Sequence, residues 1–279
     1  MTTGTFAGGT AVAVALVLLA LNLAGVMCGT PEHPIAAVQS KHKNGIDSLT
    51  YQRSLDALAS IEDQYPAGDR LSKITSVFAA RLRYYWPAAD KTDVDAMFAW
   101  HENWYLAARQ RLEAALARQG MANVDIARLE RRDYRSILQK GVGLCSQESL
   151  AIADYLAEQG RPAFIVALGG HVVALTTLAQ QNYVLDPAYN VTFAVPATKP
   201  STWAEIARGA YTGAGYSGKR LERVVDVYRK TTADGPLEVS RYTGGPRRTL
   251  RLAEVIKWAM PLVLLMLGGW LMVRAQRRP

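Results

Sequence analysis

Residues 140–190 place the strongest constraint on the fold, because they are patterned as one helix followed by three short strands. Apolar and small residues recur at helical spacing from Cys145 to Leu156, and Gly160 ends that pattern. Apolar runs of strand length follow at residues 163–168, 171–175 and 183–186, with turns expected at 169–170 and 180–182. A helix packed on an antiparallel sheet, which is an α+β fold, is therefore expected here.

Three reactive side chains occupy defined places in this pattern. Cys145 lies in or next to the first helical turn, where unpaired backbone N–H groups and the helix dipole favour a thiolate. His171 begins the second strand and Asp186 ends the third. Antiparallel pairing brings these two side chains together if both face the same side of the sheet. A thiol, an imidazole and a carboxylate are the groups needed for nucleophilic acyl chemistry.

The local motifs around these residues also resemble a known family. Gly143-Leu144-Cys145 starts the helix, Gly170-His171-Val172 lies on a strand, and Leu185-Asp186-Pro187 follows on the next. In this order they resemble the transglutaminase-like cysteine protease superfamily, in a bacterial membrane-anchored form, with motif support over residues 135–195. The resemblance implies a core shared with papain, in which the catalytic helix packs on an antiparallel sheet. It further implies that Cys145 is the nucleophile, His171 the general base and Asp186 the residue that orients the imidazole.

The chain departs from the family pattern at two points. The interval between the cysteine and the histidine is short for the family, which indicates a compact domain without the usual insertions. The neighbours of the cysteine, Leu144 and Ser146, indicate no subfamily.

Each residue alone has a plainer interpretation. A lone cysteine is more often a small buried hydrophobe than a nucleophile, and Asp186 before a proline can simply start a turn. Gln139 precedes Cys145 at the separation where papain-like enzymes place an oxyanion-hole glutamine, although a solvated loop position is the alternative. Glu148 is expected to be a surface residue that complements the helix dipole. The joint occurrence of Cys145, His171 and Asp186 favours catalysis.

The remaining reactive residues indicate no cofactor and no metal. Cys28 and Cys145 are the two cysteines, so no disulfide can form inside the soluble part. An unpaired thiol in an oxidising compartment is expected to be either used or buried. The four histidines are scattered, and no cluster of His, Cys, Asp and Glu has metal-ligand spacing. The sequence also lacks a phosphate-binding glycine loop.

Both ends of the chain are apolar enough to suggest transmembrane helices. Residues 6–27 are almost unbroken apolar sequence and are long enough to span a bilayer. Residues 258–273 are shorter, and Val255 and Ile256 extend them toward the length of a thin or tilted span. A cleaved signal peptide is the alternative for the first segment. No Lys or Arg precedes it and no small-x-small site ends it, which favours an uncleaved anchor.

The charge distribution argues against nucleic acid as a partner. The net charge is +8, but residues 247–279 hold seven Lys/Arg and one acidic residue, which leaves 25 basic and 23 acidic side chains elsewhere. The basic excess therefore lies beside a membrane segment, where it would contact anionic headgroups. The arginines after the last span favour a cytoplasmic C-terminus and a central domain on the periplasmic side of a bacterial inner membrane. Four basic residues on the other flank nearly balance them.

These segments define the expected domain organisation. The expected parts are an anchor (1–30), a tether (31–46), a transglutaminase-like domain (47–231), a linker (232–254), a transmembrane helix (255–274) and a basic tail (275–279). Within the domain, residues 47–134 are expected to be helical and residues 135–231 to form the catalytic core.

Apolar stripes at helical spacing predict the helices of this domain. Before the cysteine they run from Tyr51 to Leu58, from Leu71 to Tyr85, and from Val94 to Leu112 with Thr92 or Asp93 as cap. Further helices are expected after Ser201 and over residues 221–228. His101 lies on the third stripe and is expected at the core or its boundary. The aromatic residues of this region are expected to pack in the core, with a substrate groove as the alternative.

The expected function is a membrane-anchored thiol enzyme, a hydrolase or acyl transferase that acts on an amide or ester through a thioester on Cys145. Water as acceptor makes it a peptidase or amidase, and an amine makes it a transglutaminase-type crosslinker. The substrate would be a peptide or protein near the membrane, with envelope assembly partners. A catalytically silent binding module in a membrane assembly, such as a polysaccharide-export system, is the alternative. Acyl transfer from a coenzyme A thioester is a third possibility, which needs a cytoplasm-facing domain.

Overall fold

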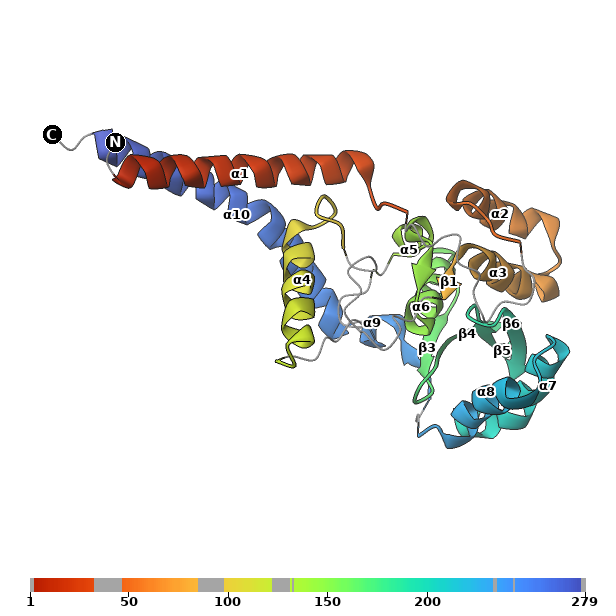
Figure 1. Ribbon diagram of the computed structural model, residues 1–279. Coiled ribbons are helices and arrows are strands. Elements are labelled where there is room, and N and C mark those ends of the chain that lie inside the picture. Colours follow the sequence, from red (N-terminus) through yellow and green to blue (C-terminus); the bar gives the residue numbers. More distant parts are fainter. Residues whose placement is uncertain are drawn as a thin grey trace. The chain divides into compact units, whose positions relative to one another are not determined.

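A computed structural model of the chain describes residues 3–32, 47–84, 98–121, 131, 133–232, 235–242 and 244–276 (Figure 1). The chain divides into two compact units. Unit 1 comprises Met1–Pro31, Pro87–Leu129 and Gly245–Pro279, and unit 2 comprises Glu32–Trp86 and Glu130–Gly244. The expected helical part, residues 47–134, contributes to both units.

A five-stranded sheet forms the centre of unit 2. Its strands are β3 (Ala163–Ala167), β4 (Val172–Leu178), β5 (Gln181–Asp186), β6 (Val191–Val195) and β7 (Leu237–Glu238). They lie in the order β6-β5-β4-β3-β7, and each pairs antiparallel with its neighbours. The predicted α+β class and the three predicted strands are confirmed, while β6 and β7 were not expected.

Tight hairpins connect β3, β4 and β5. Gly169 and Gly170, with φ of 63° and 127°, form the predicted first turn, which Leu168 N closes with a 2.8 Å bond to the carbonyl of His171. The second turn lies at Ala179 and Gln180, slightly earlier than the predicted 180–182. Both residues have positive φ, 49° and 63°, which is the geometry of two-residue hairpin turns that match strand twist.

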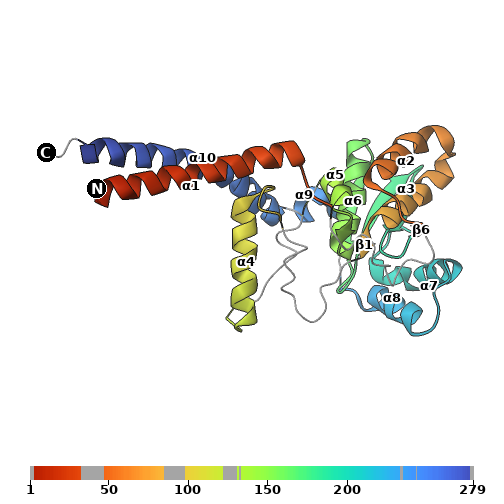
Figure 2. The ribbon, with the colours of Figure 1, turned by 45° about the horizontal axis from the view of Figure 1, so that its top comes forward.

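Helices cover both faces of the sheet. One face carries α2 (Tyr51–Gln64), α3 (Ala67–Arg81), α5 (Tyr134–Lys140) and α6 (Cys145–Glu158). The other carries the 3₁₀ helix η4 (Pro200–Trp203), α7 (Ala204–Gly213) and α8 (Gly218–Lys230). Successive side chains along each strand point to opposite faces of the sheet and so contribute to both cores. Ile165 packs with α6, while its neighbour Val166 packs with α7 and α8. Figure 2 shows the helical layers from a second direction.

A short parallel pair holds the chain that leads into α6. β1 (Arg83–Tyr84) pairs with β2 (Val142–Gly143), and Arg83 N donates to the carbonyl of Gly141 at 2.9 Å. The stripe predicted to be helical from Leu71 to Tyr85 therefore ends as a helix at Arg81. Pairing with β2 replaces the last helical turn, because these backbone groups bond across to β2 instead of along a helix.

The expected linker, residues 232–254, is partly structured. β7 adds to the edge of the sheet by pairing with β3, and α9 (Val239–Tyr242) follows it. Residues of this range also form the beginning of α10 (Gly244–Gln276). The glycines and prolines that suggested a linker flank these short elements rather than forming a continuous loop.

Unit 1 contains α1 (Thr3–Cys28), α4 (Trp104–Arg118) and α10. Residues 6–28 and 248–276 of α1 and α10 are long and apolar enough to cross a membrane. The two helices contact closely at Gly8 and Gly268, where a Cβ on either glycine would lie 2.8 Å from the carbonyl of the other. Small residues thus allow the two backbones to approach.

The third predicted stripe is helical in its second half. α4 begins at Trp104, and Asn103 caps it by accepting a 3.0 Å bond from Leu106 N. His101 lies in a turn before this helix rather than on it. The expected caps Thr92 and Asp93, and the start of the stripe at Val94, lie outside the described residues.

Replacing Gly141 should destabilise unit 2 more than replacing a glycine of similar backbone conformation. Gly141 has φ of 77° and its added Cβ would lie 3.0 Å from the guanidinium of Arg81, whereas Gly160 has φ of 70° and open space around it. We expect Gly160→Ala to cost about 1–2 kcal/mol of backbone strain, and Gly141→Ala to cost more. Urea unfolding of the full chain in detergent measures the difference. Equal decreases in the free energy of unfolding for the two variants would show that the contact with Arg81 adds nothing to the cost of Gly141→Ala.

Candidate active site

The three residues that the sequence singled out meet where α6 begins. Cys145 is the first residue of α6, His171 directly precedes β4, and Asp186 ends β5. His171 Nε2 lies 2.7 Å from Asp186 Oδ2, and the side chains of His171 and Cys145 are also hydrogen-bonded. Because Nε2 faces the carboxylate, Nδ1 is the ring nitrogen left for the thiol. The three side chains therefore form one hydrogen-bonded chain.

The sheet register brings His171 and Asp186 together. Ala174 pairs with Leu185, and continuing this register places Asp186 opposite Val173. His171 and Val173 point to the same side of the sheet because alternate residues share a face. His171 and Asp186 are thus diagonal neighbours, at a spacing that long side chains can bridge.

Ser149 fixes the thiol over this pair. One turn after Cys145, its hydroxyl donates a 2.8 Å bond to the carbonyl of Val172, the residue after His171. The bond ties the first turn of α6 to the start of β4. Ser149 lies on the helical stripe seen in the sequence, but the stripe alone does not reveal its bond to the strand.

The site is almost entirely shielded from solvent. Cys145 is 7 % exposed, His171 6 % and Asp186 0 %. Burial alone lowers the pKa of His171, but the charge of Asp186 and the hydrogen bonds to Asp186 and Cys145 outweigh it and raise that pKa. The imidazole is therefore held in its charged form at neutral pH, beside the thiol.

Two tyrosines that sequence reasoning missed lie on the α7 and α8 side of Asp186. Tyr211 of α7, which is fully buried, donates its hydroxyl to the same Oδ2 that His171 contacts. The hydroxyl of Tyr228 on α8 lies 3.3 Å from that of Tyr211. Burial, followed by the charge of Asp186, raises the pKa of both phenols well above the usual value, so they remain hydrogen-bond donors. No local motif marks them, because both lie on helices far along the chain.

A further tyrosine packs against the imidazole itself. The ring of Tyr189 meets the ring of His171 edge-on, with centroids 5.4 Å apart. Tyr216 donates a 2.8 Å hydrogen bond to the carbonyl of Tyr189 and thereby fixes its position. Burial, with the charge of Asp186, raises the pKa of Tyr189 to about 12. Tyr189 thus restricts the rotation of the imidazole.

Arg81 organises the backbone just before the cysteine. Its guanidinium donates to the carbonyls of Leu138 and Gln139 at 2.6 and 2.9 Å, and so satisfies two carbonyl groups at the C-terminus of α5. It also contacts the carboxylate of Glu32 at 2.7 Å. Gln139 itself is the next-to-last residue of α5, with a half-buried side chain. Its oxyanion role stays a prediction.

Glu148 is not the surface residue that the sequence suggested. Its side chain is fully buried in the first turn of α6. Burial and the nearby charge of Arg81 lower the pKa of Arg83, and the carboxylate of Glu148 opposes them by raising it. β1, which contains Arg83, was expected to be the end of a helix, and for this reason a basic neighbour of Glu148 was not predicted.

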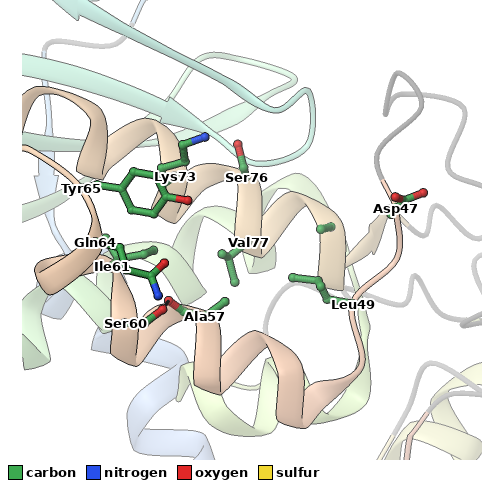
Figure 3. Close-up of a pocket in the computed structure, with 11 residues that line it drawn as sticks. Asp47, Leu49, Ala57, Ser60, Ile61, Gln64, Tyr65, Lys73, Ser76 and Val77 are labelled. Carbon is green, nitrogen blue, oxygen red and sulfur yellow. Dashed lines mark hydrogen bonds between the residues drawn. The ribbon is translucent and has the colours of Figure 1, made fainter.

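A separate cavity of about 380 Å³ lies between α2 and α3 (Figure 3). Leu49, Ile61 and Val77 contribute apolar surface, and the ammonium of Lys73 lies 5.0 Å from the centre of the Tyr65 ring. The residues that line it include neither Cys145, His171 nor Asp186. Within the described part of the chain, no group of three His, Cys, Asp or Glu side chains is placed to hold a metal ion.

Comparison of the chain with protein families, curated proteins and solved structures finds no match. The resemblance to transglutaminase-like enzymes therefore remains an expectation that rests on the three sequence motifs. The geometry of the site is a separate observation.

The His171–Asp186 pair should make stability depend on pH. A pKa raised above the unfolded value near 6.5 stabilises the fold fully below that pH, and this contribution is lost as pH rises toward about 10. A Cys145→Ser background removes the contribution of Cys145 to the raised pKa but keeps that of Asp186, so we expect the free energy of unfolding to fall as pH rises above about 6.5. Urea unfolding with and without His171→Gln measures the effect. Parallel pH profiles for the two proteins would contradict it.

Removing the Tyr211 hydroxyl should slow the reaction of Cys145 with iodoacetamide. Tyr211→Phe deprives Asp186 of a donor to a buried charge, so the imidazole is held less firmly and the rate should fall about tenfold. Tyr228→Phe is the matched control, because it removes only the longer bond to Tyr211 and should have a smaller effect. Equal rates in all three proteins would show that Tyr211 plays no positioning role.

Proposed function

We propose that this chain is a membrane-anchored thiol enzyme that cleaves or transfers an acyl group from an amide through a thioester on Cys145. The observation that carries the proposal is the hydrogen-bonded chain from Cys145 through His171 to Asp186. A structural cysteine requires neither a charged imidazole at its sulfur nor a buried carboxylate behind that imidazole. Both groups are costly to bury unless they are paired.

Each group has a defined part in the proposed reaction. The sulfur of Cys145 attacks the carbonyl carbon of the substrate while its proton resides on His171. His171 returns that proton to the departing amine, which leaves a thioester. Water or a second amine then attacks the thioester and gives its proton to His171, and the thiol is restored. Asp186 holds the imidazole in the required tautomer throughout.

The start of α6 is suited to stabilise the negative charge that develops on the carbonyl oxygen. The first N–H groups of a helix have no partner within that helix. The N-cap residue Leu144 makes no side-chain cap hydrogen bond. The backbone N–H of Cys145 is therefore the proposed first donor to the oxyanion, with the Gln139 amide as the proposed second donor.

The apolar helices support the proposal that this chemistry takes place at a membrane. α1 and α10 both have the length and composition to span a bilayer. We place the C-terminal arginines in the cytoplasm of a bacterial cell, and unit 2 on the periplasmic side of the inner membrane. A peptide or protein held near the membrane is the proposed substrate, because tethering at both ends keeps the thiol close to the bilayer.

Alkylation of Cys145 at different pH values tests the proposal. In a Cys28→Ser background, iodoacetamide can label Cys145 alone. We expect rapid labelling of the folded protein below pH 7, because the imidazolium of His171 stabilises the thiolate. His171→Ala should reduce this rate by about tenfold or more and make labelling depend on alkaline pH.

Product analysis then separates an enzyme from a silent binding module. A peptide library incubated with the intact protein should yield products of hydrolysis or crosslinking that Cys145→Ala does not form. Asp186→Asn is the graded control, since it keeps an acceptor for Tyr211 but changes the charge behind His171, and it should retain partial activity. A Cys145 that stays inert until the protein is denatured would instead support the binding module.

A further inference from the structure

Helix α4 lies across the α1–α10 pair within unit 1. Both views show it running across these two long helices rather than along them (Figures 1 and 2). Its beginning is fixed to α10 by three contacts. The cap residue Asn103 donates to Glu254 at 2.8 Å, the indole of Trp104 donates to the carbonyl of Lys257 at 3.3 Å, and Leu106 packs against Ala253.

The same place marks one end of the apolar part of the helix pair. Asn22 of α1, which is fully buried, donates a 2.7 Å bond to the carbonyl of Lys257. The ammonium of Lys257 donates to the carbonyl of Glu102 at 2.6 Å and lies 5.9 Å from the ring of Trp258. Beyond this point α10 exposes large apolar side chains, among them Met260, Leu262, Val263, Met266 and Trp270. These polar contacts lie where the uncharged stretch of α10, residues 258–273, begins, and Leu252 and Val255 are exposed on the other side of this point.

The length of that apolar stretch fits a bilayer. Arg274 follows it at the other end, with its guanidinium 5.0 Å from the ring of Trp270. From Lys257 to Arg274 a helix rises about 25 Å, close to the hydrocarbon thickness of about 30 Å. Trp258 and Trp270 lie near the two ends, where tryptophan is enriched in membrane proteins. α4 therefore starts at the level of one bilayer surface.

The free side of α4 has the pattern of a helix that rests on such a surface. Ala108, Leu112 and Ala115 share one face at helical spacing, and Leu112 is 61 % exposed. The opposite face, with Leu106 and Ala114, is buried. The helix carries three arginines and one glutamate, and these arginines lie on both sides of the exposed face. Arg109 pairs with Glu113 at 2.7 Å, Arg111 donates to the carbonyls of Phe98 and Ala107, and Arg118 is exposed. An apolar face bordered by arginines suits the boundary between acyl chains and anionic headgroups.

We propose that α4 lies in the headgroup layer of an anionic bilayer, with Leu112 and its neighbours toward the acyl chains and Arg109 and Arg118 toward lipid phosphates. The occupant of this face is the bilayer itself, because α4 starts beside Glu254 and Lys257, the last charged residues before the uncharged stretch of α10. The inference rests on the proposed membrane anchoring by α1 and α10. It adds a third contact that holds unit 1 at a fixed depth.

Fluorescence of a reporter attached at Leu112 tests the position of α4. The full chain with Cys28→Ser and Cys145→Ser receives Leu112→Cys, which is labelled with an environment-sensitive dye and reconstituted into vesicles of phosphatidylcholine and phosphatidylglycerol. Lipids that carry a quencher near the headgroup should reduce the emission about twofold or more. Ala115→Cys, on the same face, should respond alike. Lys219→Cys on exposed α8 is the water-exposed control and should not respond.

The outcomes separate this inference from the proposed function. Flotation with the vesicles after alkaline washing reports anchoring by α1 and α10 independently of the dye. If the protein does not float, both the anchoring and the inference fail. If it floats but the dye at position 112 is not quenched, α4 is covered by water or protein and the inference alone is overturned. Arg109→Gln with Arg118→Gln should weaken quenching, and quenching that persists unchanged in pure phosphatidylcholine would overturn the anionic preference.

Discussion

The buried carboxylate of Asp186 is the group on which the architecture of unit 2 depends. A charge with no exposed surface costs several kcal/mol unless hydrogen bonds and an opposite charge compensate it. His171 and Tyr211 supply this compensation at the same oxygen, Oδ2. Neither can do so unless the sheet register and the packing of α7 on the sheet are both correct. The second helical layer, with Tyr228 behind Tyr211, is thus required by a single ionised group as well as by apolar burial.

The thiol is positioned by a different set of contacts on the other helical face. Ser149 fixes the first turn of α6 to β4, while Arg81 and the β1–β2 pair fix the chain that enters that turn. Two independent scaffolds therefore converge at the end of the sheet, one that orients the imidazole and one that holds the sulfur. Such separation suits a proposed catalytic group, because preorganisation needs rigid support around each reacting side chain.

Local sequence patterns predicted the parts of the site, and long-range contacts decided what surrounds it. The alternation of residues 163–186 and the helical spacing after Cys145 sufficed to predict three strands, one helix and the meeting of Cys145 with His171 and Asp186. β1 and β7 were missed because two-residue strands have no period of their own and form only where a partner edge exists. Tyr211 and Arg81 were missed because each bonds to residues that lie far away in the sequence, and no local pattern reveals such contacts. Glu148 was wrongly expected at the surface. Its place in the first helical turn explains why an acidic residue is favoured there, but it does not determine whether other elements bury the side chain.

The close approach of Gly8 and Gly268 joins the first helix of the chain to the last. Translation completes α1 long before α10 is made, since Cys28 ends the former and Gly244 begins the latter. At ordinary elongation rates the interval is roughly 10 to 40 seconds. During this time the amide of Asn22 lacks its acceptor on Lys257. In a nascent chain, the one buried polar side chain of an otherwise apolar helix must therefore bond to another partner until α10 has been made.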